Sequence, residues 1–134
     1  MKINYLALYG IALGLFVALD AVWLGAIAKN LYATELKSLM TKDIKWAAAV
    51  LFYLIFLVGL VYFVIAPTIK SGGANHLAFA GALFGLVTYA TYDLTNYATL
   101  KGFPLKIVVI DLAWGTLVSL LVSSGAYTLY TKFF

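Results

Sequence analysis

Long apolar stretches alternate with short polar connections along the whole chain. A helix that spans a bilayer requires about 20 predominantly apolar residues. Four stretches satisfy this requirement, and they cover about residues 5–28, 46–66, 76–100 and 105–130. Because the connections between them are short, the pattern predicts an all-α membrane protein with four transmembrane helices, folded as a single domain over residues 1–134.

The connection after the first span has a pattern of its own. It contains five charged residues, which are Glu35, Lys37, Lys42, Asp43 and Lys45. Its apolar residues are spaced for one helical face, and they are Leu31, Tyr32, Leu36, Leu39 and Met40. A helix with one apolar and one charged face lies in the interface between bilayer and water. We therefore expect a short interfacial amphipathic segment here, either a helix or a folded loop lying on the headgroups, and we expect the second span to end at Pro67.

The composition supports this membrane fold and excludes several classes of protein. Hydrophobic residues make up 65% of the chain, whereas soluble domains are about 45 to 50% apolar. The chain has no cysteine and one histidine, His76, which excludes disulfides, thiolate metal sites and multi-histidine sites within one chain. All nine basic residues are lysines in scattered positions, without the basic stripe of a nucleic-acid-binding protein. We expect a lipid bilayer around the protein, no cofactor and no nucleic-acid partner.

The lysines also predict an orientation. The first and third loops hold six of them, and the termini and the second loop hold three. Short loops rich in lysine stay on the cytoplasmic side of a membrane. The first and third loops are therefore expected in the cytoplasm and both termini outside. No small-residue cleavage signature follows the first apolar run, so we expect that run to be retained as a span.

Three aspartates, Asp20, Asp93 and Asp111, interrupt otherwise apolar spans. An ionisable residue at the centre of a span costs about 2.5 to 3.5 kcal/mol on insertion scales, so it usually serves a function or a specific polar contact. Counted from the nearest lysine of the first or third loop, each aspartate lies about 8 to 14 Å deep at 1.5 Å per residue. The three carboxylates are therefore expected to share one layer near these loops.

Other polar and aromatic residues are expected in the same layer. They are Trp23, Tyr89, Tyr92, Thr95, Asn96 and Trp114. The tryptophans are suited to contact a cationic or amphipathic ligand through cation–π interactions, and Asn96 with Thr95 could supply oxygen ligands to a hard cation. In the alternative interpretation the tryptophans mark the membrane interface, Asn96 bonds a neighbouring helix, and the carboxylates accept hydrogen bonds from Trp or Tyr. The sequence does not decide whether a metal ion is bound.

Small residues at GxxxG spacing occur on two spans. Gly10 and Gly14 lie on the first, and Gly81 and Gly85 on the third. Such pairs allow helices to approach closely. We expect them to seal the half of the bundle away from the aspartates, or else to form the contact of a homo-oligomer.

Four blocks of the sequence resemble one known family. They are LDAVWLG (residues 19–25), FYLIFLVGLVYFVIAP (52–67), GALFGLVTYATYDLTNYATLKGFP (81–104) and IDLAWGT (110–116). Together they are similar to the bacterial integral membrane family catalogued as domain of unknown function 2177. The resemblance implies a bacterial four-span protein, for which we expect the cytoplasmic (inner) membrane as location. It implies no activity and no functional residues.

Three functions are compatible with the aspartate layer. The first is a small transporter or binding protein for protons, a cation or an amphipathic solute. The second is a structural or accessory subunit whose polar layer packs helices or a partner. The third is a membrane enzyme acting on a lipid-like substrate. Enzymatic activity is the less favoured, because the serines of the fourth span have no histidine at their depth to act as a base, and we assign no catalytic residue.

Overall fold

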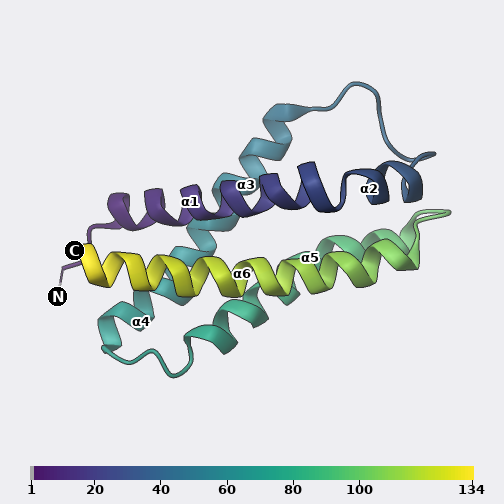
Figure 1. Ribbon diagram of the computed structural model, residues 1–134. Coiled ribbons are helices and arrows are strands. Elements are labelled where there is room, and N and C mark those ends of the chain that lie inside the picture. The colour runs from purple at the N-terminus through teal and green to yellow at the C-terminus, as the bar shows by residue number, and fades with distance from the viewer. Residues whose placement is uncertain (1) are drawn as a thin grey trace.

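The computed structural model describes residues 2–134 and is all-helical over that range. Four helical stretches are long and apolar enough to cross a membrane (Figure 1). Two are single helices, α5 (Leu77–Thr99) and α6 (Leu105–Phe133). The other two are compound. One is α1 (Tyr5–Val22) with the π-helical turn η1 (Trp23–Ile27), and the other joins α3 (Trp46–Leu60), the π-helical turn η2 (Val61–Ile65) and α4 (Ala66–Ser71).

The α5–α6 hairpin is the most closely packed part of the fold. The two helices are joined by a tight turn in which Gly102 has φ 76°, a left-handed conformation that glycine adopts without strain. Gly81 and Gly85 lie against α6 so closely that a Cβ on Gly85 would lie 2.0 Å from the carbonyl oxygen of Gly115. The GxxxG pair of the third span therefore forms an internal helix contact, as one of the two predicted uses requires.

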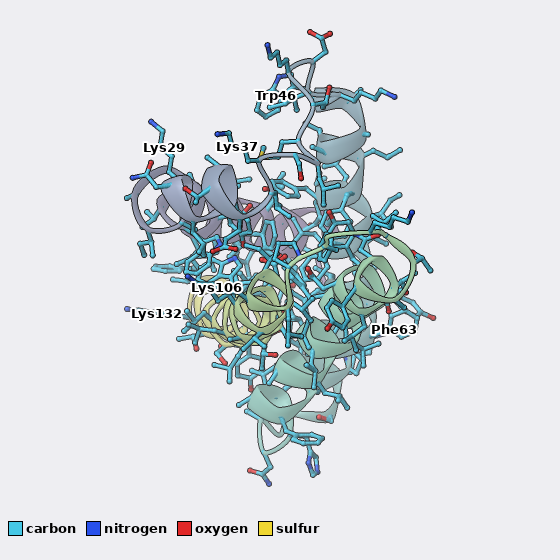
Figure 2. The ribbon with its side chains drawn as sticks, turned by 90° about the vertical axis from the view of Figure 1, so that its right-hand side faces the viewer. Lys29, Lys37, Trp46, Phe63, Lys106 and Lys132 are labelled. Atoms are coloured by element: carbon cyan, nitrogen blue, oxygen red, sulfur yellow. The ribbon has the colours of Figure 1, made fainter. Side chains whose placement is uncertain are left out.

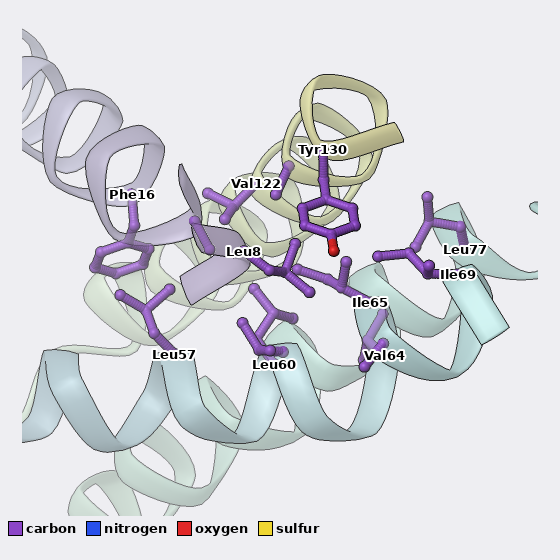
Figure 3. Packing of buried hydrophobic residues seen from close by; sticks show 14 of the residues in the cluster. Leu8, Phe16, Leu57, Leu60, Val64, Ile65, Ile69, Leu77, Val122 and Tyr130 are labelled. Carbon is purple, nitrogen blue, oxygen red and sulfur yellow. The ribbon is translucent and has the colours of Figure 1, made fainter. Parts of the chain in front are cut away.

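Helix α1 packs on α6, and the apolar core lies where these two helices meet the second span (Figure 3). Phe16 of α1, Leu57 of α3 and Val122 of α6 are fully buried in this core. At the far end the backbone N–H of Asn4 donates a 2.8 Å hydrogen bond to the Tyr130 hydroxyl, so the beginning of α1 is tied to the end of α6. Both termini and the second loop consequently lie at one end of the bundle (Figure 1).

The second span crosses the bundle at an angle, and only part of it is packed. From Phe56 onward it contributes buried residues to the core, and Gly59 lies against the Phe84 ring of α5. Residues 46–55 are exposed except for the half-buried Tyr53. Figure 2 shows Trp46 at the end of this stretch, which projects away from the other spans. The helices α3 and α5 therefore meet near Gly59 and diverge toward the first loop.

Two expectations about these elements were wrong. The second span does not end at Pro67, because the helix continues through this residue to Ser71. Gly10 and Gly14 do not seal the bundle, since both are exposed and a Cβ on either would meet nothing within 4 Å. The segment 31–45 is helical only as part of α2 (Lys29–Glu35).

The apolar residues of α2 are directed at the protein. Leu31, Tyr32 and Leu36 pack against a small cluster formed by Phe103, Ile107 and Val108 at the beginning of α6. An ion pair of 3.5 Å between Glu35 and Lys106 lies beside this contact. The first and third loops thus come together at the end of the bundle seen in Figure 2, where Lys29, Lys37 and Lys106 are labelled.

Candidate functional site

A cavity of about 750 Å³ lies at the end of the bundle that carries the first and third loops. All four spans and α2 contribute to its wall. Nearly half of its lining residues are aromatic, and these are Trp23, Tyr32, Phe52, Tyr53, Tyr89, Tyr92, Phe103 and Trp114. All three intramembrane aspartates line it as well.

Asp20 lies on α1 and is 6% exposed. Its Oδ1 accepts a 3.1 Å hydrogen bond from Nε1 of Trp114 on α6, and its Oδ2 accepts one from the hydroxyl of Tyr53 on α3. Both oxygens therefore have donors, and the donors come from two other spans. In an apolar environment such bonds hold helices in one arrangement, because a separated partner would be left unsatisfied.

Asp111 lies on α6 and is bonded in a similar way. Its Oδ1 accepts a hydrogen bond from the Tyr32 hydroxyl, whose oxygen accepts a 3.1 Å bond from Nε1 of Trp23. Burial, and after it the hydrogen bond to Asp111, raises the pKa of Tyr32 above its ordinary value of 10.0. The phenol is therefore neutral at physiological pH and remains a donor. Through it α2 is fixed on α6.

The two Asp-x-x-Trp pairs, Asp20 with Trp23 and Asp111 with Trp114, interact reciprocally. Trp114 donates to Asp20, and Trp23 reaches Asp111 through Tyr32. The two indoles stack with ring centroids 4.6 Å apart and planes inclined by 6°. The helix α1 with η1 and the helix α6, which carry the two pairs, run in opposite directions (Figure 1). We call this arrangement the α1–α6 clasp.

Asp93 of α5 differs from the other two aspartates. It is 0% exposed, and neither of its carboxylate oxygens has a hydrogen-bond partner within residues 2–134. Asp93 and Asp111 are close enough for their charges to interact. Burying a charge without a partner costs many kcal/mol, so this carboxyl requires a proton or a cation beside it. Among the aspartates of the layer, Asp93 is thus the one that accepts no hydrogen bond from a Trp or Tyr side chain of residues 2–134, and Asp111 is near enough to share a proton with it.

Most of the predicted site residues meet at this cavity. Seven of the nine line it, and these are Asp20, Trp23, Tyr89, Tyr92, Asp93, Asp111 and Trp114. Asn96 instead lines a neighbouring cavity of about 340 Å³ beneath residues 36–44. Thr95 is exposed and lines neither cavity, because two residues along a helix rotate it by about 200° from Asp93. No group of three or more His, Cys, Asp or Glu side chains within residues 2–134 is arranged to hold a metal ion.

Two residues of the site were missed in the sequence. Tyr53 belongs to the span that we expected to be only scaffold, and Tyr32 was expected to lie on the membrane interface. The depth count contained a usable signal for Tyr53, which lies eight residues after Lys45 and so about 12 Å deep, within the aspartate layer. No comparable signal existed for Tyr32, because its place depends on how α2 folds back.

Comparison with known families gives one match. The family described as "Predicted membrane protein (DUF2177)" matches residues 5–128. The chain belongs to this family. Comparison with curated proteins and with solved structures gives no match. The part of the chain that matches DUF2177 contains all three aspartates and both tryptophans of the α1–α6 clasp. The description of DUF2177 agrees with the four candidate spans and identifies a multi-pass membrane protein.

Proposed function

We propose that this protein binds an organic cation with an apolar body in the cavity, as a binding protein or a small transporter. The observation that carries the proposal is Asp93, which lines the cavity and is buried with both oxygens unpartnered among residues 2–134. A ligand with one positive charge would supply the partner that the carboxyl needs.

The charge balance of the cavity supports this choice of ligand. Three carboxylates line the cavity, and none of the residues described in its wall is basic. Asp20 and Asp111 are occupied with holding α1, α2, α3 and α6 together through their hydrogen bonds. In this proposal Asp20 and Asp111 therefore have a structural role, and Asp93 binds the ligand.

The aromatic wall supports an organic cation rather than a hydrated metal ion. The faces of Trp, Tyr and Phe attract cations that have lost their water, and such contacts stabilise by about 2 kcal/mol or more when desolvated. Pockets for organic ligands combine an apolar lining with a few polar groups that fix orientation. The cavity has this character, with the Trp23 and Trp114 indoles in its wall.

Location and orientation are part of the proposal. We place the protein in the cytoplasmic membrane with the first and third loops in the cytoplasm, on the basis of the lysine distribution. The chain has no cysteine, so Lys37→Cys and Lys70→Cys provide single labelling sites. An impermeant maleimide added outside the cell should label only the second variant. Labelling of Lys37→Cys alone would reverse the orientation.

The binding proposal is tested with a pair of probes that differ in charge. Phenyltrimethylammonium is a cation, and tert-butylbenzene is its neutral isostere. In a Trp46→Phe background the two remaining tryptophans both line the cavity, so their fluorescence reports on binding. We expect the cation to bind and the neutral isostere to bind at least about tenfold more weakly, a difference of about 1.4 kcal/mol.

A second test compares two variants that each remove one carboxylate, Asp93→Asn in the cavity and Asp43→Asn in a loop. Asp93→Asn should weaken binding of phenyltrimethylammonium by at least about tenfold. Asp43→Asn removes the same charge from an exposed loop position and should leave binding unchanged. Equal affinities for the two probes, or equal binding by Asp93→Asn and the parent, would refute the proposal.

A further inference from the structure

The cavity has a mouth on the side of the bundle. Several of its lining residues are themselves exposed, including Phe52 at 45%, Leu24 at 45% and Tyr92 at 59%. Thr91 also lines the cavity and is exposed. Phe52 belongs to the diverging half of α3, and Thr91 and Tyr92 belong to α5. One opening of the cavity therefore lies in the gap between α3 and α5, and Met40, which lines the cavity and is 49% exposed, marks another toward the first loop.

The mouth between α3 and α5 is at the depth of the hydrocarbon region. Thr91 lies ten residues before Lys101, which corresponds to about 15 Å along the helix, or half of a typical hydrocarbon core. Phe52 lies six residues after Trp46, which corresponds to about 9 Å. A molecule passing between these residues enters or leaves through the lipid phase.

The two threonine hydroxyls near the mouth bond to backbone carbonyls of α5. The Thr91 hydroxyl donates a 2.7 Å bond to the carbonyl of Val87, and the Thr88 hydroxyl donates a 2.9 Å bond to that of Phe84. Both hydroxyls are thus satisfied within their own helix. The lower end of the gap is closed where Phe56 and Phe84 meet, with ring centroids 5.4 Å apart.

We infer that the ligand is a membrane-resident amphiphile, an alkylammonium whose charged head lies at Asp93 and whose chain leaves the cavity between α3 and α5 into the bilayer. This inference rests on the proposed function and adds to it the substrate class and the route of entry. The buried carboxyl determines the position of the head. The apolar mouth at hydrocarbon depth determines the direction of the chain.

Two threonines of α5 provide a matched test. Thr91 and Thr95 are both exposed and lie one turn apart, but only Thr91 lines the cavity. In the absence of native cysteine, Thr91→Cys and Thr95→Cys can each be modified with a biotin maleimide. Both adducts are reconstituted in phosphatidylglycerol nanodiscs and titrated with decyltrimethylammonium, which has a chain, and phenyltrimethylammonium, which has none.

The adduct at Thr91→Cys should fill the mouth and weaken decyltrimethylammonium binding at least about tenfold, whereas the adduct at Thr95→Cys should not. Phenyltrimethylammonium, which has no chain, should lose less affinity at the Thr91→Cys adduct than decyltrimethylammonium does, and it should bind the Thr95→Cys adduct as well as the unmodified protein. Equal binding of decyltrimethylammonium to the two adducts would overturn the inference and leave the proposed function standing. If the unmodified protein bound neither cation, the proposed function would fail and the inference with it.

Discussion

Asp20 and Asp93 can be changed by the same substitution, and the structure predicts a larger loss of stability for Asp20→Asn than for Asp93→Asn. Asp20→Asn exchanges one carboxylate oxygen for an NH₂ group, although both oxygens accept hydrogen bonds from Tyr53 and Trp114. The NH₂ group can donate to the Tyr53 oxygen, but the Tyr53 O–H then loses residue 20 as its acceptor. Asp93→Asn exchanges an oxygen that has no hydrogen-bond partner within residues 2–134, so it removes no bond.

The expected change in the free energy of unfolding for Asp20→Asn follows from the hydrogen bonds that are lost. A hydrogen bond between membrane helices contributes about 0.6 to 1.7 kcal/mol, and a buried donor left unsatisfied costs about 1 to 3 kcal/mol. We expect Asp20→Asn to lower the free energy of unfolding by about 1 to 3 kcal/mol on this basis. For Asp93→Asn we expect a smaller loss than for Asp20→Asn, because one buried polar group without a described hydrogen-bond partner replaces another.

The assay is unfolding by sodium dodecyl sulfate in maltoside micelles, followed by near-ultraviolet circular dichroism. The stacked Trp23 and Trp114 are expected to dominate that signal. Tyr53→Phe serves as a second variant, because it removes one donor to Asp20 and keeps the aromatic ring. It should lose part of the stability that Asp20→Asn loses. If Asp93→Asn destabilised the protein as much as Asp20→Asn, the division into structural and binding aspartates would be wrong.

Two further predictions concern packing and titration. Gly85→Ala should destabilise the protein by about 1 to 3 kcal/mol, because the new Cβ would meet the Gly115 carbonyl. Gly14→Ala should not, because the Cβ at residue 14 would face open space. Equal unfolding midpoints for the two variants would refute this helix contact. Since burial and Asp111 raise the pKa of Tyr32, its hydrogen bond should persist below about pH 10 and be lost only as pH rises through the raised pKa. The phenolate difference spectrum between parent and Tyr32→Phe should therefore be absent at about pH 11, where a free tyrosine is about 90% ionised, and a transition near pH 10 would contradict it.

Much of the fold could be predicted from hydrophobic periodicity and length. The all-helical membrane class and four candidate spans agree with the structure. Helix ends were less predictable, because Pro67 is compatible both with leaving a helix and with beginning the next one. The two GxxxG pairs look alike in sequence, yet Gly81 and Gly85 contact α6 while Gly10 and Gly14 face outward. Which face of a helix meets a neighbour depends on tertiary packing.

The depth of the candidate site in the bundle could be predicted from the sequence, but its hydrogen bonds could not. Counting residues from the loops brought Asp20, Asp93 and Asp111 to a common depth, and the structure gathers them around one cavity. Depth alone gives no angular information, so it wrongly included Thr95. It also could not show that Tyr32 and Tyr53 supply donors to two aspartates and leave Asp93 without one. That distinction requires side-chain positions from several helices.

The central claim is that a positive charge binds beside Asp93. Phenyltrimethylarsonium replaces the ammonium nitrogen of the earlier probe with arsenic, so anomalous diffraction from crystals grown with it locates the charge directly. We predict one arsenic peak inside the cavity of about 750 Å³, within about 6 Å of the Asp93 carboxylate, the range over which opposite charges interact strongly. The peak should disappear in Asp93→Asn. An arsenic peak outside the cavity, or one that persists in Asp93→Asn, would contradict the claim.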